Sequence, residues 1–325
     1  MLLDKVRETT SKYRLINKGD KIVIGVSGGP DSLTLLKVLF KLSKEFKLEI
    51  YIAHLDHMLR KDSYKDREFV ERLAKDMRLA VISGKVDVMR LAQKGSIEEI
   101  ARNARLDFLF RVANKTRADA IALGHNLDDQ AETVLMRLLR GTGLHGLSAM
   151  LPEKIICGHR IIRPLIEVSR KEIASFLKKT KLVPRIDKTN LDDAYFRNKV
   201  RNRLLPLLEK EYNPNIKEIL ANTAQVIGCD YDYLMGIARQ KSEKLGKRIV
   251  TEKLLRLHPA MQRMVLRLAI ARIQGGMRRI TFKHIKEVED LIYNRPIHSI
   301  VNLPQGVYVV KKNKFIHFSQ NKQRD

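Results

Sequence analysis

Six residues near the start of the chain have the composition of an anion-binding loop. Ser27-Gly28-Gly29-Pro30-Asp31-Ser32 follows an apolar run at residues 21–26 and precedes apolar positions with helical spacing up to Leu42. Two glycines let backbone N–H groups approach an anion closely, and the serine hydroxyls add donors. Pro30 suits the first turn of a helix, and a helix N-terminus favours negative charge. We therefore predict a phosphate loop at residues 27–32.

Asp31 is the unusual member of this loop, because a carboxylate repels a bare phosphate. A Mg²⁺ ion, or a cationic or proton-bearing second substrate, would resolve that conflict. The loop is not a Walker A motif, since no Gly-Lys-Ser/Thr follows it. A simple glycine turn before a helix is the alternative interpretation.

A second group of polar residues occupies residues 124–133, which read Gly-His-Asn-Leu-Asp-Asp-Gln-Ala-Glu-Thr. Asp129 and Glu132 are three positions apart, and Asp128 and Glu132 are four apart, so one helical face can carry these carboxylates. Acidic residues in a first turn often only offset the helix dipole. Clustered acids repel one another unless a cation compensates, which favours metal or amine binding. His125 alone is equally compatible with a packed core histidine.

These two motifs fall within an alternation of apolar strands and amphipathic helices. We expect strands at residues 21–26, 48–53, 80–83 and 120–123, and helices at residues 30–42, 66–78, 96–113, 128–140 and 169–179. This alternation predicts an α/β fold, with a twisted parallel sheet and helices on both of its faces. Ligands bind beyond the carboxyl ends of such strands. The residues after Val26, Ala53 and Leu123 should therefore line one pocket.

The second part of the chain has a different pattern. Beyond Pro214 come long helical stretches at residues 216–244 and 259–274, then three short strand-like runs at residues 299–301, 307–310 and 315–318. We place a domain boundary near Tyr212-Asn213-Pro214. The prediction is a catalytic domain at residues 1–213 and a smaller, mainly helical domain with a short β tail at residues 214–325.

The net charge of the chain indicates which class of macromolecule it binds. The 325 residues contain 63 Lys and Arg against 37 Asp and Glu, a net charge of +26, and residues 201–325 hold 24 basic against 11 acidic side chains. Such an excess favours nucleic acid, because binding phosphates releases condensed counterions. Aromatic residues make up 6% and Trp is absent, so base stacking is not the expected main mode of RNA recognition.

Cysteine content and hydropathy restrict the compartment. Cys157 and Cys229 form neither a zinc motif nor a CxxC pair, and no apolar run approaches the roughly 18 residues that a membrane span requires. The first 14 residues carry several charges and no signal-peptide pattern. We expect a cytoplasmic protein that does not bind membranes. A homodimer is compatible with the sequence, which leaves the oligomeric state open.

The Ser27–Ser32 motif resembles the loop of the PP-loop ATP pyrophosphatases. Within that superfamily, several further segments resemble the lysidine synthases of isoleucine tRNA. They are His54-Leu55-Asp56-His57-Met58-Leu59-Arg60, the stretch GHNLDDQAETVLMRLLRGTGLHGLSAM at residues 124–150, Arg163-Pro164-Leu165, Asp187-Lys188-Thr189-Asn190, and Tyr195-Phe196-Arg197-Asn198-Lys199-Val200-Arg201. Longer members of the family carry a further C-terminal domain that we expect to be missing here.

The resemblance implies a reaction and its participants. The wobble cytidine of isoleucine tRNA with a CAU anticodon is adenylated by ATP at its C2 oxygen, and free L-lysine then displaces AMP to give lysidine. ATP and Mg²⁺ are the implied cofactors. The ATP site is expected at Ser27, Gly28, Gly29, Pro30, Asp31, Ser32, Ala53, His54, Gly124 and His125. Asp31 and Asp128 are expected to bind the metal ion.

The remaining roles follow from the chemistry of the implied reaction. A carboxylate can hold the lysine ammonium and then accept its proton, and Asp31, Asp129 and Glu132 are the candidates. Arg197 and Arg201 lie four apart, so both could bind phosphate or the activated base. The alternative for these two arginines is an ordinary solvated helix face.

Three rival functions remain at this stage. Gly141-Thr142-Gly143-Leu144-His145-Gly146 matches the dinucleotide fingerprint, but it follows a helix where that fingerprint requires a strand. A tRNA thiolase of the same superfamily would need cysteines at a suitable spacing, which Cys157 and Cys229 lack. A non-catalytic, nucleotide-sensing RNA-binding module would be distinguished by its lack of turnover.

Overall fold

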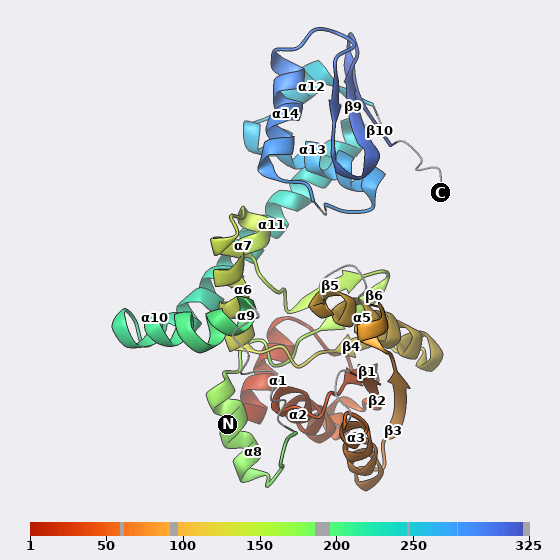
Figure 1. Ribbon diagram of the computed structural model, residues 1–325, viewed down its shortest axis with the longest axis vertical. Helices are drawn as coiled ribbons and strands as arrows, with labels where there is room; N and C mark the ends of the chain where they lie inside the picture. Colours follow the sequence, from red (N-terminus) through yellow and green to blue (C-terminus); the bar gives the residue numbers. More distant parts are fainter. Residues whose placement is uncertain (59–61, 92–96, 186–195, 246–247, 278, 321–325) are drawn as a thin grey trace. The chain divides into compact units, whose positions relative to one another are not determined.

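The computed structural model describes residues 1–58, 62–91, 97–185, 196–245, 248–277 and 279–320 (Figure 1). The chain forms two compact units, Met1–Gly228 and Cys229–Asp325, and each is described here by itself. The predicted helix start at Ser96, the segment Asp187–Asn190 and Tyr195 lie outside the described residues, as do Leu59 and Arg60.

A six-stranded sheet forms the centre of the first unit, with strand order β3-β2-β1-β4-β6-β5. Its strands are β1 (Lys21–Gly25), β2 (Glu49–Asp56), β3 (Ala80–Lys85), β4 (Ala120–Ala122), β5 (Glu153–Ile156) and β6 (His159–Ile162). All neighbours pair in parallel except β5 and β6, which form an antiparallel hairpin at one edge. The predicted parallel sheet is confirmed, and this hairpin is an addition that the sequence patterns did not indicate.

Helices cover both faces of the sheet because neighbouring strand residues point to opposite sides. Ile22 and Ile24 pack on one face with α1 (Leu2–Lys12), α2 (Pro30–Phe46), α3 (Tyr64–Asp76) and α8 (Arg170–Lys179). Val23 and Ile121 pack on the other face with α5 (Ile97–Thr116) (Figure 1). The expected burial on both faces is therefore confirmed.

The remaining helices of this unit pack against one another, except for α4 (Val88–Leu91), which contacts α5. They are α6 (Leu127–Leu139), α7 (Leu144–Leu147), α9 (Phe196–Lys199), the π-helix η2 (Val200–Leu204), α10 (Leu205–Glu211) and the first part of α11 (Ile216–Leu245), which continues into the second unit. Ala131 and Leu135 of α6 contact Val200 and Leu205, and Leu220 of α11 packs beside them. This cluster holds the 196–205 segment against α6.

Strand order decides where a ligand can bind. β1 has β2 on one side and β4 on the other, and α2, which follows β1, packs on the opposite face of the sheet from α5, which precedes β4. A crevice opens at such a switch point beyond the carboxyl ends of the strands. The phosphate loop follows β1 and the 124–133 segment follows β4, so both begin at this point.

The second unit is built on a four-stranded antiparallel sheet with order β7-β10-β9-β8. Its elements are β7 (Ile249–Val250), α12 (Thr251–Leu255), α13 (Pro259–Gln274), α14 (Phe282–Tyr293), β8 (Ile300–Asn302), η3 (Pro304–Gly306), β9 (Val307–Lys311) and β10 (Phe315–Gln320). One apolar cluster joins the sheet to α13 and α14. The helices at residues 216–244 and 259–274 and the three tail strands are confirmed within one or two residues, whereas α14 was not predicted.

Candidate functional site

The phosphate loop is held in shape by its own serines. Ser27 N donates to Ser32 Oγ at 3.2 Å, Gly29 N donates to Ser27 Oγ at 3.3 Å, and Ser32 Oγ donates to Gly29 O at 3.1 Å. Gly28 has φ +89°, a backbone conformation that residues with a Cβ rarely adopt. Pro30 begins α2, as predicted from the sequence. The loop is therefore ordered by its own hydrogen bonds at a helix N-terminus, a position that favours negative charge.

The 124–133 segment contacts this loop directly. Asn126 Nδ2 donates to Asp31 Oδ1 at 2.9 Å, and Asn126 Oδ1 accepts from the backbone N–H of Asp129 at 2.9 Å. A Cβ placed on Gly124 would lie 3.0 Å from the backbone carbonyl carbon of Asp31. The prediction that the two motifs meet at one edge of the sheet is therefore confirmed.

Ala53 and His54 reach the same edge from β2. The backbone O of Ala53 accepts from Val26 N at 2.9 Å, and His54 Nδ1 lies 2.8 Å from Val26 O. His54 is 3% exposed, and its Nε2 has no hydrogen-bond partner among the described residues. That orphaned nitrogen is buried, in a ring that contacts Val26, the residue before the phosphate loop.

Three arginines surround the buried carboxylate of Glu132. Arg170 Nη1 donates to Oε1 at 2.6 Å, Arg197 Nε to Oε2 at 2.7 Å, and Arg201 Nε to Oε1 at 2.7 Å. Glu132 is 0% exposed. The interpretation of Arg197 and Arg201 as a solvated helix face is therefore wrong.

The same arginines also contact Asp129. Asp129 Oδ1 lies 2.7 Å from Arg170 Nη2, 3.0 Å from Arg197 Nη2 and 3.5 Å from Arg201 Nη2, while Oδ2 accepts from Asn126 N at 3.2 Å. We call these five side chains, Asp129, Glu132, Arg170, Arg197 and Arg201, the arginine–carboxylate cluster. Three guanidinium groups against two carboxylates leave it with a net positive charge. The compensating cations that the sequence required are thus supplied by the chain itself.

Asp128 has separate partners. Its Oδ2 accepts from the backbone N of Arg170 at 2.8 Å, and its Oδ1 lies 3.3 Å from Lys217 Nζ. Lys217 also pairs with Glu209 at 2.8 Å. Within the described part of the chain, no three His, Cys, Asp or Glu side chains are grouped so that they could hold a metal ion.

The carboxylates of the site differ in pKa because their surroundings differ. Burial, followed by the charge of Asp129, raises the pKa of Asp31 to about 6. Burial alone would raise the pKa of Glu132, but the hydrogen bond from Arg201 and the charges of the three arginines lower it to about 2. Asp31 is therefore the carboxylate best suited to exchange a proton near neutral pH.

Arg170 and Arg163 are the main residues that sequence reasoning did not assign to the site. In the sequence, Arg170 stands only near the start of the helix expected at residues 169–179, which the structure begins with a capping box of Ser169 and Glu172. Arg163 is 4% exposed and donates from Nε to His125 Nδ1 at 3.2 Å. The burial of Arg163 and the pairing of Arg170 with two carboxylates become visible only in the folded structure, so the sequence carried no signal for these roles.

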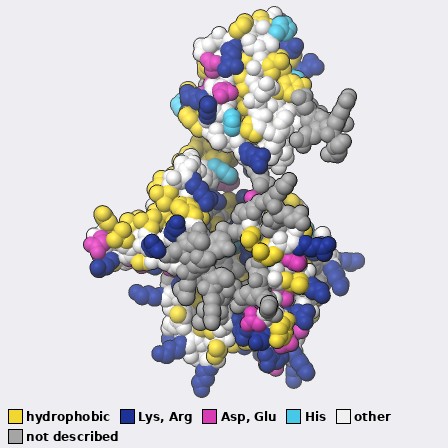
Figure 2. Space-filling model, in the orientation of Figure 1, with side chains coloured by type: hydrophobic (Ala, Val, Ile, Leu, Met, Phe, Trp, Pro, Cys, Tyr) yellow, Lys and Arg dark blue, Asp and Glu magenta, His cyan; other side chains and the backbone are white. Residues whose placement is uncertain are grey.

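Basic side chains also extend beyond the site. Figure 2 shows Lys and Arg on the visible surface of both units, with fewer Asp and Glu, in keeping with the net charge of +26. In the described chain, no helix combines the length and the apolar character needed to cross a membrane.

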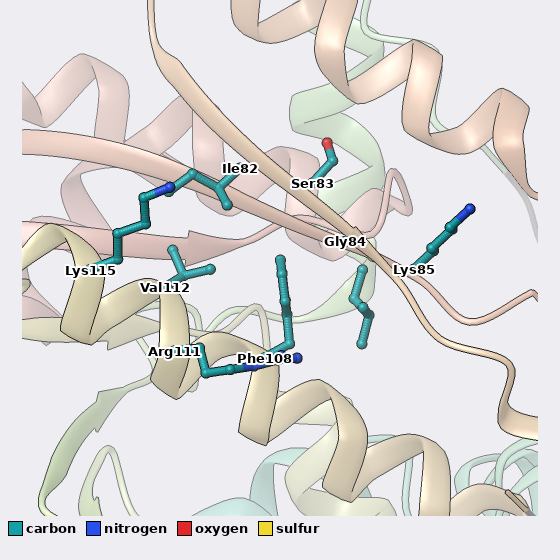
Figure 3. A pocket seen from close by; sticks show the side chains of 9 residues that line it. Ile82, Ser83, Gly84, Lys85, Phe108, Arg111, Val112 and Lys115 are labelled. Atoms are coloured by element: carbon teal, nitrogen blue, oxygen red, sulfur yellow. The ribbon is translucent and has the colours of Figure 1, made fainter.

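A separate hollow lies between β3 and α5 (Figure 3). Its volume is about 320 Å³, and Leu55, Ile82, Phe108 and Val112 form its apolar lining. The rest of the lining contains no predicted site residue; it consists of Ser83, Gly84, Lys85, Arg111 and Lys115. The hollow is therefore distinct from the crevice at the switch point.

Comparison with known proteins agrees with this geometry. A family model described as a PP-loop domain matches residues 3–208, and one described as a TilS substrate binding domain matches residues 251–314. The tRNA(Ile)-lysidine synthase of Clostridioides difficile is 39% identical over 97% of this chain and 70% of its own length. This chain belongs to the tRNA(Ile)-lysidine synthase family.

Other family members show the same extent of similarity. The tRNA(Ile)-lysidine synthase of Caldanaerobacter subterraneus is 37% identical over 95% of this chain and 67% of its own length.

A U34-tRNA thiolase, NcsA from Methanococcus maripaludis, superposes with a TM-score of 0.59 over 70% of this chain and 77% of its own. At 21% identity, that likeness describes the fold alone. As a member of the PP-loop family, the chain is an enzyme that uses ATP.

Proposed function

We propose that this chain uses ATP to attach free L-lysine to C2 of the wobble cytidine in the CAU-anticodon isoleucine tRNA, through an adenylated cytidine. Family membership supports this reaction. The structural observation that carries the proposal is the 2.9 Å hydrogen bond from Asn126 to Asp31, because it joins an anion cradle to a cluster of acids and arginines.

In the first step, the phosphate loop holds the β,γ-diphosphate of ATP. The C2 oxygen of cytidine attacks the α-phosphorus, the bond from that phosphorus to the diphosphate breaks, and diphosphate leaves with the electron pair. Arg197 and Arg201, which pair with Asp129, would supply fixed positive charge as negative charge grows on the phosphate oxygens. The adenylated C2 oxygen is then a good leaving group.

In the second step, the ε-amine of lysine attacks C2 and AMP leaves. The free ammonium has a pKa of about 10.4 and must lose a proton first. We assign that proton to Asp31, because its pKa is about 6 whereas that of Glu132 is about 2. A carboxylate with the higher pKa is the stronger base.

Asp129 and Glu132 would contribute to lysine recognition indirectly, by holding three arginines in place. The α-carboxylate of lysine fits the forked donors of Arg170, Arg197 and Arg201, which carry one positive charge in excess. Its ammonium would then face Asp31 and Asp129, which lie close enough for the charge of one to raise the pKa of the other.

Mg²⁺ fits this site only in part. Both oxygens of Asp128 are already engaged, by Arg170 N and Lys217, so the predicted role of Asp128 as a metal ligand has little support. Asp31 lies in the phosphate loop, and only its Oδ1 accepts a hydrogen bond from the described residues. Mg²⁺ is usually held by one or two carboxylates and by substrate phosphates. When bound, it would neutralise phosphate charge, with Asp31 as its protein ligand, and Asp31 could accept the lysine proton only once the metal has left with diphosphate.

The same proposal covers the remaining partners. The second unit, with its match to a TilS substrate binding domain, would bind the tRNA. A cytoplasmic location remains a prediction, and it agrees with tRNA and ATP as substrates. A homodimer also remains a prediction, which light scattering can test.

Incubation with ATP, Mg²⁺, lysine and the isoleucine tRNA transcript, followed by nucleoside mass analysis, tests the function. We expect lysidine, together with diphosphate release that requires the tRNA. A sulfur-containing nucleoside formed with a sulfur donor would instead support a thiolase, for which Cys157 and Cys229 are free and exposed. Binding of ATP and tRNA without any turnover would leave only a nucleotide-sensing module.

A further inference from the structure

Arg163 and His125 meet at the same edge of the sheet. Arg163 directly follows β6, and His125 lies three residues after β4, the parallel neighbour of β6. Arg163 donates from Nε to His125 Nδ1 at 3.2 Å and from Nη1 to Leu151 O at 2.7 Å. The guanidinium is thus fixed at both ends, and Arg163 is only 4% exposed.

The hydrogen bond between Arg163 and His125 allows only one assignment of donor and acceptor. A guanidinium has five N–H donors and no acceptor, so His125 Nδ1 must present its lone pair to Arg163. A proton on Nδ1 would place two N–H groups against each other. The neutral ring must therefore carry its proton on Nε2. Burial and then the charges of Arg163 and the neighbouring Arg105 and Arg197 lower the pKa of His125 well below its usual value, in agreement with a neutral ring.

The Nε2–H of His125 is free to serve the substrate. His125 is partly exposed, and no residue of the described chain accepts a hydrogen bond from its Nε2. The next residue, Asn126, contacts Asp31 of the phosphate loop. An N–H donor at this place suits an oxygen of the adenylate phosphate or the cytidine C2 oxygen.

We propose that Arg163 is a positioning residue that fixes His125 as a neutral Nε2–H donor to the oxygen at the reacting centre. This inference rests on the proposed function. It also excludes His125 as the base for the lysine ammonium, since Nε2 already carries a proton and Nδ1 is occupied by Arg163. The proton of lysine must then pass to a carboxylate.

The first test is independent of activity. Selective ¹⁵N labelling of the nine histidines, with assignment by loss of a signal in His125→Gln, reports which ring nitrogen is protonated. We expect a single tautomer with the proton on Nε2 in the wild type, and a mixture in Arg163→Met. A proton on Nδ1 in the wild type, or an unchanged pattern in Arg163→Met, would overturn the inference even if lysidine is formed.

The second test is a double-mutant cycle on tRNA-dependent diphosphate release. Glutamine at position 125 has an N–H₂ donor and no tautomers, so it should not depend on Arg163. Arg163→Met should lower the rate roughly 10- to 100-fold with His125 present, a typical cost of losing the partner that orients an imidazole. In the His125→Gln background, the further loss should be at most about twofold.

A purely structural arginine would behave differently. It would lower the rate by the same factor in both backgrounds, and that result would refute the proposed role. Arg160→Met is the matched control, because Arg160 lies in the same hairpin and bonds Glu153 and the backbone O of Leu15. It should reduce thermal stability while leaving the His125 spectrum unchanged. Arg163→Lys, which keeps one charged donor, should restore part of the lost rate.

Discussion

At the scale of single residues, Asp31 is half-buried, and its surroundings disfavour the ionised form of its carboxyl group. Its pKa rises from 3.8 to about 6 on folding, so the folded state binds its proton more tightly than the unfolded chain does. The stabilising contribution of the protonated form is therefore complete below pH 3.8 and is lost as the pH rises through 6. Above that pH the ionised carboxylate lowers stability.

Asp31→Asn should accordingly have opposite effects on stability and activity. At pH 7, we expect a gain in the free energy of unfolding on the order of 2 to 3 kcal/mol, and no gain near pH 4. Thermal melting at the two pH values measures this difference. Adenylation should be abolished while tRNA affinity is largely kept; a variant with the wild-type adenylation rate would disprove the catalytic role.

Glu132 is the opposite case, because its charge is required by three arginines. Glu132→Gln should destabilise the protein by about 2 to 3 kcal/mol, since it removes a buried charge that three partly buried arginines share. It should also raise the lysine requirement more than the ATP requirement. Glu252→Gln is the control, because Glu252 pairs with Arg256 at an exposed site and should change stability by less than about 1 kcal/mol. Equal effects on lysine and ATP would contradict a role in lysine recognition.

Local patterns predicted the acids of the site but not their partners. Asp129 and Glu132 stand out because they share one helical turn with Asp128. Arg170 is 38 residues from Glu132 in sequence, and its contact depends on how α6 and α8 pack. A capping-box pattern places the start of a helix without showing what its first residue touches.

At the scale of elements, the close approach of the β4–α6 turn to the start of α2 is made possible by Gly124. A methyl group there would lie 3.0 to 3.1 Å from backbone atoms of Asp31 and Ser32, which cannot move without shifting the phosphate loop. Gly124→Ala should therefore raise KM for ATP roughly tenfold or more, a change of about 1.4 kcal/mol in binding. Steady-state diphosphate release measures it.

Gly143→Ala is the matched control. Gly143 has an extended backbone with φ −93°, and no atom lies within 4 Å of an added Cβ. Activity and stability should stay close to wild type. If both alanine variants raised KM alike, the tight contact between the two loops would not explain the effect.

Among the elements, long periodic segments were predictable and short or edge segments were not. β5 and β6 contain four residues each, so they are too short for an alternating pattern to be recognised. Cys157 and Gly158, both with positive φ, join them. α14 was missed although Ile285, Val288, Leu291 and Ile292 have helical spacing and are buried, so a signal was present in the sequence.

At the scale of the whole molecule, charge and chemistry are divided between the units. Residues 229–325 contain 20 basic and 8 acidic side chains, whereas the phosphate loop and the arginine–carboxylate cluster lie entirely in residues 1–228. A boundary near Pro214, as proposed from the sequence, would cut off Leu220 and Ala224 of α11, which pack against α6. Truncation is better placed after Gly228.

A fragment of residues 1–228 should keep ATP binding and lose much of its tRNA affinity. Because fewer phosphates would be neutralised, the dependence of log Kd on log salt concentration should also become shallower. Filter binding over a range of salt concentrations provides the measurement. A fragment that bound tRNA with the wild-type affinity and salt dependence would refute the assignment of the second unit to RNA binding.

The arginine–carboxylate cluster has one further consequence, for attack by proteases. Trypsin cleaves after arginine, and Arg197 and Arg201 are held by Glu132 within a helical turn packed on α6. Cleavage at these two bonds requires local opening of that turn. In Glu132→Gln, trypsin should cleave at these two bonds well before it degrades the sheet β3-β2-β1-β4-β6-β5. In the wild type, added lysine should slow this cleavage.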